Sequence, residues 1–342
     1  MLPFRENAIF RYEHYRSVMG EPMQLSDRIG RRMKLHDLHV LMAVVQAGSM
    51  SKAAAVLNTG QSAISRSIAE LEHTFGVRLL DRNRQGVQPT EYGRALLDGG
   101  TAVFDDLRQT VRNIEFLADP TVGEVVVGCN HVLASSFVSG VVVRLRRRFP
   151  RVVFRLTTEY VPSLLRELLA RNVDLLVARR PDLIVDERLD YEFLFDDSYS
   201  IVAGAKSPWA RRRRIELAEL VDEPWVLPPP GSATGSVTAA AFRASGLDYP
   251  RAAVITDSIE GRKSLLATGS FISIFPDSIW RFCSGPPDFK ILAVKQPLTL
   301  VPVGVITLKN RTTSPLAGLF ISAARELAKH LTKGKSGGHK VG

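Results

Sequence analysis

Cysteine is scarce in this chain of 342 residues, which contains only Cys129 and Cys283. They lie far apart in sequence, and neither has a neighbouring cysteine. This spacing excludes a disulfide framework and a cysteine-based zinc site. A reducing compartment such as the cytoplasm fits best, and both thiols are most simply small buried side chains.

Long apolar runs are missing as well. The first 32 residues carry charges throughout and lack the apolar stretch of a secretory signal. Residues 125–143 contain no Lys, Arg, Asp or Glu, but they include Gly128, Asn130, His131 and three serines. A membrane span of about 20 mostly apolar residues would not readily carry so many polar groups. The segment therefore predicts a buried strand followed by a helix, with no membrane insertion.

Signatures of the common enzyme classes are also missing. The chain has no G-x-S-x-G elbow, no H-E-x-x-H pair, no P-loop and no G-x-G-x-x-G after a strand. The run GSATGS at residues 231–236 could cradle an anion, but it is a weak signal. We expect no catalytic residue, no metal site and no cofactor. An enzyme is the main alternative class of function that we weighed.

The composition is that of a folded protein, with 45% apolar and 23% charged residues. A chain of 342 residues is too long for one ordinary domain of about 100 to 200 residues, so two or three units are expected. The net charge of +10 admits an anionic partner such as nucleic acid. It does not locate that partner, because residues 1–118 carry 15 basic and 13 acidic side chains, a net of only +2.

Three short helices and two strands are predicted near the start of the chain. Apolar residues recur at spacings of three and four between Leu35 and Val45, and Gly48 ends that helix. A second helix follows with Ser49 or Ser51 as its cap, and a tight turn at residues 58–60 leads to a third helix at 61–75. Residues 79–90 predict two short strands around a basic turn.

The third helix has two different faces when its residues are placed at about 100° intervals. One face is apolar and predicts burial: Ile64, Ile68, Leu71 and Phe75. The other face carries only small or hydrogen-bonding side chains: Gln61, Ser62, Ser65, Arg66 and Ala69. Small residues allow a close approach to a partner, whereas a Leu or Phe there would hold the helix away.

Together these elements are the parts of a winged helix-turn-helix, whose last helix lies in the major groove of DNA. Gln61 can bond an adenine edge, and Arg66 a guanine edge or a phosphate. Arg82 and Arg84 in the basic turn suit the phosphate backbone or the minor groove. The full set of predicted DNA contacts is Ser51, Gln61, Ser62, Ser65, Arg66, Arg82 and Arg84. The alternatives are a generic three-helix packing element and, for Arg66 alone, a solvated surface residue.

A long helix is predicted from residue 91 to residue 117, with Thr90 as its cap. Its apolar positions approximate a heptad seam, which is typical of helices that pair: Leu96, Val103, Leu107, Ile114 and Leu117. Gly99 and Gly100 interrupt the helix, so the pairing is expected to be local or kinked. From residue 119 onward strands and helices alternate, which favours βαβ units on a mostly parallel sheet, and the last helix is expected at 315–331.

Residues 33–97 carry five spaced motifs: the Ala53–Ala54 pair, Q-S-x-x-S-R at residues 61–66, AELE at 69–72, GVRLL at 76–80 and T-E-x-G at 90–93. With these motifs the start of the chain resembles the DNA-binding head of LysR-type transcriptional regulators. The rest resembles that family more weakly, through RLRRRFP at 144–150, VDLLV at 173–177 and LLATGSFISIFPDS at 265–278. Gly60 departs from the Ser or Thr that is commoner before the Gln, but glycine still serves as a helix cap.

The resemblance implies an α/β fold with an α-rich head. Its parts would be an N-terminal extension (1–32), a winged helix-turn-helix domain (33–90), a dimerising linker helix (91–118), a two-subdomain effector module like a type 2 periplasmic binding protein, and a disordered tail (332–342). Effector subdomain I would comprise 119–198 and 300–331, and subdomain II 199–299. The partners implied are double-stranded DNA, a small-molecule effector, further copies of the chain in a homodimer or homotetramer, and RNA polymerase. A cytoplasmic, nucleoid-associated protein is expected.

The effector site is carried over by position, to loops where strands end and helices begin. The candidate contacts are Asn130, His131, Val132, Tyr160, Ser163, Ser232, Thr234 and Ser270. Helix N-termini there would favour an anionic or hydroxyl-rich ligand such as a sugar or sugar acid. His131 is equally explained as a plain loop donor, and the arginines at 211–214 as a solvated loop. A solute-binding protein is the third class, and the DNA-binding head speaks against it.

Overall fold

The computed structural model describes residues 33–83, 86–179, 186–282, 289–294 and 300–334. Two compact units meet within one helix, the first ending at Asp105 and the second beginning at Asp106. Arg84, Cys283 and the expected extension at 1–32 lie outside the described residues. The last helix, α13 (Pro315–Gly334), runs three residues beyond the expected end, so the tail prediction applies only to 335–342, which also lie outside the described residues.

Three helices form the core of the first unit: α3 (Leu35–Ala47), α4 (Met50–Val56) and α5 (Gln61–Phe75). Gly48 and Gly76 end α3 and α5 in the left-handed conformation, each with a φ of 70°. The Ser49 hydroxyl accepts a hydrogen bond from the Lys52 N–H at 3.1 Å, so Ser49 rather than Ser51 caps α4. The helices bury one apolar cluster that includes Leu41, Val44, Ala53, Ile64, Ile68 and Leu71.

A two-stranded wing follows, made of β1 (Leu80–Asn83) and β2 (Gly86–Pro89). The strands are antiparallel, and Leu80 pairs with Pro89. The Glu72 side chain ties the wing to α5, because its carboxylate accepts the backbone N–H groups of Leu79 and Leu80 at 2.8 and 3.3 Å. Thr90 caps α6 (Glu91–Ala118), as its hydroxyl accepts the Gly93 N–H at 3.0 Å.

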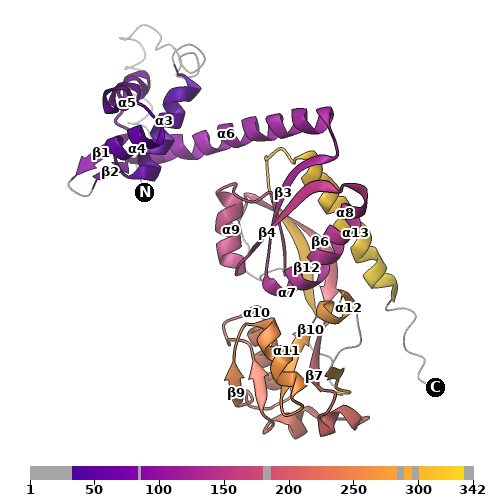
Figure 1. Ribbon diagram of the computed structural model, residues 1–342. Coiled ribbons are helices and arrows are strands. Elements are labelled where there is room, and N and C mark those ends of the chain that lie inside the picture. Colours follow the sequence, from indigo (N-terminus) through magenta and orange to yellow (C-terminus); the bar gives the residue numbers. More distant parts are fainter. Residues whose placement is uncertain (1–32, 84–85, 180–185, 283–288, 295–299, 335–342) are drawn as a thin grey trace, which may run out of the picture. The chain divides into compact units, whose positions relative to one another are not determined.

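The second unit contains two lobes, each built on a five-stranded sheet (Figure 1). The sheet of lobe I has the order β4-β3-β5-β12-β6, with β3 (Val122–Cys129), β4 (Arg151–Thr158), β5 (Leu175–Arg179), β6 (Leu189–Asp197) and β12 (Val301–Leu308). Helix α9 (Val161–Leu169) covers one face. The other face packs against α13 and the helical run of α7 (His131–Leu133), a π-helical turn η1 (Ala134–Val138) and α8 (Ser139–Arg148).

The sheet of lobe II has the order β11-β7-β10-β8-β9, with β7 (Tyr199–Gly204), β8 (Trp225–Leu227), β9 (Ala252–Ile255), β10 (Ile272–Pro276) and β11 (Phe289–Ile291). Helix α10 (Ala233–Ala244) covers one face around Trp225, and α11 (Ile259–Ala267) and α12 (Ser278–Phe282) cover the other. Two 3-10 turns, η2 (Pro208–Arg211) and η3 (Leu217–Leu220), complete the lobe.

The expectation of mostly parallel sheets is wrong. In each sheet two strand pairs are parallel and two are antiparallel. The reason is the chain path: β6 runs directly into β7 of the other lobe, and β12 returns to lobe I against the direction of β5. The sequence pattern also missed β6, whose four acidic residues obscure its apolar alternation, and the short β11.

In the part of the chain that the structure describes, every helix is too short or too polar to span a membrane.

Substitutions of two glycines near the start of α6 test the packing of the first unit. A Cβ at Gly93 would lie 2.1 Å from the Leu79 carbonyl oxygen, whereas a Cβ at Gly99 would meet no atom within 4 Å. We predict that Gly93→Ala lowers the free energy of unfolding of the first unit by about 2 kcal/mol through overpacking. Gly99→Ala should raise it by up to about 1 kcal/mol, since alanine favours the helix. Urea unfolding followed by circular dichroism measures both, and equal effects of the two substitutions would contradict the prediction.

Candidate functional site: a nucleic-acid interface and a ligand cleft

Helix α5 presents a smooth polar face to solvent. Gln61, Ser62 and Arg66 are exposed and Ser65 is half-buried. On the opposite face Ile64, Ile68 and Leu71 are each only 1% exposed. The apolar face anchors the helix, so the polar face stands away from the core with no bulky side chain on it. The predicted small-residue face is therefore present as a continuous exposed surface.

Two further predicted contacts lie on neighbouring elements. Ser51 is exposed in the first turn of α4, with its hydroxyl 3.4 Å from that of Ser49. Arg82 is exposed on β1, opposite Val87 of β2. Within the described residues neither Arg66 nor Arg82 forms an ion pair with an acidic side chain, whereas Arg78 lies 4.0 Å from Asp81. Unneutralised arginines beside a smooth helix face suit a polyanion such as DNA.

The second candidate site lies where the two lobes face each other. The loops that follow β3 and β4 of lobe I begin at Asn130 and Glu159, and the loops that follow β8 and β9 of lobe II begin at Pro228 and Thr256. In each lobe these strands are parallel, so the loops share one edge of the sheet. Ligands of open α/β sheets bind at this edge.

A cavity of about 410 Å³ lies between these edges. It is lined by His131 and Ser135 of lobe I and by Asp257, Ser258, Ile259 and Glu260 of lobe II. The Tyr160 hydroxyl donates a hydrogen bond of 2.7 Å to the Asp257 carboxylate, which joins the two lobes beside the cavity. This bond lowers the pKa of Asp257, with His131 and Arg262 as weaker causes, and it raises the pKa of Tyr160. Asp257 is thus held as a carboxylate.

The eight predicted effector residues have different positions and hydrogen-bond partners in the structure. His131 lines the cavity and Tyr160 bonds to one of its lining residues. Asn130 and Ser232 cap α7 and α10. The Ser163 hydroxyl accepts a hydrogen bond from Arg166 at 3.0 Å, and Thr234 is buried beside the lobe II edge.

Two of the predicted effector residues do not fit the cleft. Val132 is buried in an apolar cluster with Val202, Ile259 and Phe275 of lobe II, so it holds the lobes together by packing. Ser270 precedes β10, which runs parallel to β8, and it therefore lies at the opposite edge of the sheet from the cavity. That turn leads from a helix into a strand, whereas the cleft loops lead from a strand into a helix.

Five cavity-lining residues were not anticipated from the sequence: Ser135, Asp257, Ser258, Ile259 and Glu260. Four of them belong to the loop between β9 and α11 or to the first turn of that helix. The same strand-to-helix reasoning would have found this loop, because Ser258 caps α11 by accepting the Gly261 N–H at 3.0 Å.

A buried ion pair lies beside the cleft, where the chain crosses between the lobes. The Arg179 guanidinium is 2.7 Å from the Asp197 carboxylate, and their side chains are 4% and 0% exposed. Asp197 also accepts the Ser278 N–H at 2.9 Å and the Ser278 hydroxyl at 2.7 Å. Arg262 is buried nearby in lobe II, where it stacks on Phe275 and donates to the Ile274 carbonyl, and burial lowers its pKa to about 10.

Burial raises the pKa of the Cys129 thiol to about 12, so it stays protonated and poorly nucleophilic at neutral pH. Within the described ranges no three His, Cys, Asp or Glu side chains group as metal ligands.

Comparisons with known proteins agree with this description. Residues 35–94 match the family described as bacterial regulatory helix-turn-helix protein, lysR family, and residues 118–329 match the LysR substrate binding domain. The HTH-type transcriptional regulator GbpR of Azospirillum brasilense is 26% identical over 295 residues, 86% of each chain.

Solved structures share the fold. Full-length OxyR from Pseudomonas aeruginosa aligns with a TM-score of 0.61 and 17% identity, over 86% of this chain and 95% of that one. Full-length CbnR in complex with its target DNA aligns with a TM-score of 0.51 and 21% identity, over 86% of this chain and 100% of that one. The two family matches cover most of the chain, from the helix-turn-helix through both lobes. The chain therefore belongs to the LysR family of transcriptional regulators, which are DNA-binding proteins with an effector-binding domain and not enzymes.

Proposed function

We propose that this regulator reads its operator with the exposed face of α5, that the wing holds the DNA backbone, and that a small molecule in the cleft between the lobes changes DNA binding. The observation that carries the proposal is the division of α5 into a buried apolar face and an exposed face of Gln61, Ser62, Ser65 and Arg66. A recognition helix needs this pattern, because its side chains must reach base edges without steric hindrance.

The proposed contacts differ in what they contribute. Gln61 and Arg66 carry the donors and acceptors that distinguish bases, so they would supply specificity. Arg82, Ser51 and the predicted contact Arg84 would bind phosphates and fix the position of the helix. Such a regulator acts where RNA polymerase starts transcription, so contact with the polymerase and a location at the nucleoid are part of the proposal.

An arginine substitution tests the DNA interface. Arg66→Ala should weaken operator binding by about 1 to 3 kcal/mol if Arg66 reads a base. If it binds a phosphate instead, the slope of log affinity against log salt should decrease by about one. Footprinting and fluorescence anisotropy on the DNA upstream of its gene measure both effects. Arg243→Ala, an exposed arginine of α10 in the second unit, is the matched control and should leave binding unchanged.

Helix α6 carries the surface that we propose for pairing with a second copy. Its exposed apolar side chains, Val103, Leu107, Val111, Ile114 and Leu117, are 40 to 82% exposed. They fall within an arc of about 120° on the helix surface. A contiguous apolar stripe of this kind is typical of a protein interface. A dimer would present two recognition helices about 34 to 36 Å apart, and its operator would be an imperfect palindrome.

A charge placed on this stripe tests the pairing. Val103→Asp combined with Leu107→Asp should shift the protein toward monomer, because two carboxylates would be buried without partners in the seam. DNA affinity should fall with it, since one head contacts only one half-site. Sedimentation velocity measures the oligomer. Asp98→Lys changes the charge of an exposed residue on the same helix that lies about 100° or more from every residue of the stripe, and it should leave the oligomer intact. An oligomer that survives the double substitution would show that the main interface lies elsewhere.

The cavity favours a hydroxyl-bearing ligand. Its lining offers two carboxylates, an imidazole and two serine hydroxyls, which together can accept from and donate to several ligand hydroxyl groups. A volume of about 410 Å³ suits a small metabolite. Neutral sugars and polyols are therefore the first compounds to try, because the two carboxylates would repel an anionic ligand.

A ligand screen tests the cleft assignment. We expect at least one compound from a panel of sugars, organic acids and aromatic acids to raise the melting temperature of the full-length protein. A ligand at 100 times its dissociation constant adds about 2.7 kcal/mol of stability. Asp257→Ala should remove the increase, and Asp222→Ala, at an exposed turn of lobe II, should preserve it. A ligand that stabilises the Asp257→Ala variant equally would bind outside the proposed cavity.

A further inference from the structure

Strand β5 has a buried ionic cluster at each end. The strand comprises Leu175 to Arg179, and all five residues are buried. It lies in the middle of the lobe I sheet, between β3 and β12. Arg179, its last residue, forms the ion pair with Asp197, and Asp174 comes immediately before its first residue. The two clusters are thus joined by a short, fully packed strand.

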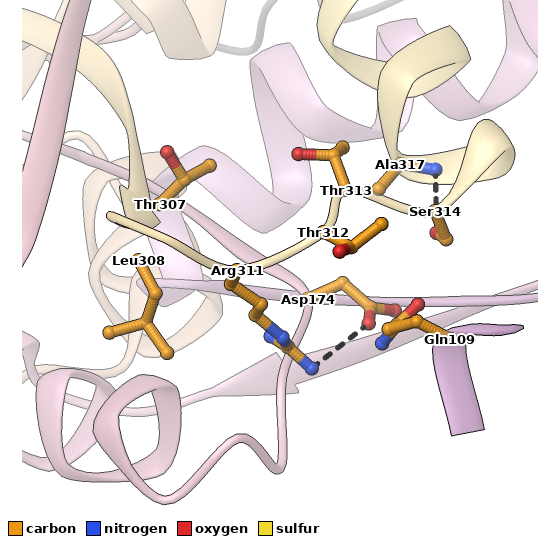
Figure 2. Close-up of a pocket in the computed structure, with 9 residues that line it drawn as sticks. All are labelled: Gln109, Asp174, Thr307, Leu308, Arg311, Thr312, Thr313, Ser314 and Ala317. Carbon is orange, nitrogen blue, oxygen red and sulfur yellow. Dashed lines mark hydrogen bonds and ion pairs between the residues drawn. The ribbon is translucent and has the colours of Figure 1, made fainter. Parts of the chain in front are cut away.

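The Asp174 cluster fixes helix α6 to lobe I. The Asp174 carboxylate is 2.9 Å from Arg112 of α6 and 3.6 Å from Arg311, and it accepts the Val126 N–H at 2.9 Å. Arg311 also donates to the Val173 carbonyl. Figure 2 shows Asp174 between Arg311 and Gln109, a second residue of α6. The side chains of Asp174 and Arg311 are each 5% exposed, whereas that of Arg112 is 33% exposed, so the centre of the cluster has little access to water.

The Asp197 cluster joins the two lobes. Asp197 is the last residue of β6 in lobe I, and Ser278, which donates two hydrogen bonds to it, is the first residue of α12 in lobe II. A change in the spacing of the lobes would act directly on this carboxylate. Arg179 is bound to it by a buried ion pair and also lies over the Tyr199 ring at 5.6 Å.

We propose that β5 couples the lobe contact to the linker helix: a displacement of Asp197 moves Arg179, and the strand carries the displacement to Asp174 and thereby to Arg112 on α6. The physical reason is that the ion pair at each end of the strand resists separation. Removing one partner of a buried ion pair leaves an uncompensated charge, so each pair tends to move as one body. The strand between them spans about 16 Å and is held by hydrogen bonds on both sides.

This coupling rests on the proposed function, in which a ligand between the lobes controls DNA binding. It would make Asp174 and Arg112 positioning residues, which touch neither DNA nor ligand but set how firmly the last turns of α6 are held. Helix α6 continues from the first unit into the second without a break in its helical assignment. A change in how its end is anchored is therefore passed to the head along the chain.

Hydrogen exchange measured by mass spectrometry tests the coupling in the full-length protein without ligand or DNA. Ser278→Ala removes one hydrogen bond from Asp197 at the lobe contact, and Arg112→Gln removes one ion pair from Asp174. Each substitution should speed exchange of the α6 peptide 106–118 by about threefold or more, which is the size expected for coupled neighbours. The double variant should exchange no faster than Arg112→Gln alone, because the connection is already broken.

Three comparisons make the outcome decisive. Glu326→Gln removes the exposed ion pair with Arg144 in the same lobe and should leave peptide 106–118 unchanged. Arg179→Lys keeps the charge but loses the guanidinium geometry, and it should reproduce the effect of Ser278→Ala. Rates are referred to peptide 315–330 of α13, which lies in the same unit and therefore corrects for global unfolding of that unit. Unchanged exchange at 106–118 in Ser278→Ala, or additive effects in the double variant, would overturn the coupling. Neither result depends on DNA or ligand binding, so failure of the proposed function would be recognised separately.

Discussion

The buried ion pair between Arg179 and Asp197 is the interaction on which the second unit depends. It lies at the place where the chain leaves one sheet and enters the other, with a single residue between β6 and β7. Charges removed from water are tolerated only when they are well paired, and here Ser278 donates two further hydrogen bonds to Asp197. Both partners of the ion pair belong to lobe I, and Ser278 belongs to lobe II, so these hydrogen bonds tie the pair to the other lobe.

The same crossing explains the mixed sheets and the position of the cavity. Because β6 and β12 connect the lobes, each sheet combines a parallel half with an antiparallel half. The parallel halves bring the strand-to-helix loops to the edges that face each other, so His131 and Asp257 meet across one cavity although they lie far apart in sequence. In the first unit the constraint is simpler: three helices share one apolar cluster, and the side of α5 that the cluster does not use is exposed to solvent.

Local patterns predicted the first unit well, and they predicted the cleft only in part. Spacing and residue type predict the two faces of α5, the Thr90 cap and the glycine ends of α3 and α5. The residues that form each of these features lie within a few positions of one another. Strand β6 was missed, since alternation in an acidic segment resembles an exposed loop. Val132 was assigned to the ligand although it packs against the other lobe. Asp257 was missed because it lies in a short loop between β9 and α11, and the position of that loop at the cleft depends on the pairing of β9 with β8.

The sequence by itself determined the family, the helix-turn-helix with its wing and the small-residue face of α5, because each depends on neighbours along the chain. Only the tertiary structure decided which loops form the cavity, that Ser270 lies at the far edge of its sheet, and that Asp174 and Arg179 form buried ion pairs at the two ends of β5. Those features depend on contacts between residues separated by up to a hundred or more positions. Their pairing is set by how the sheets pack, which no local pattern records.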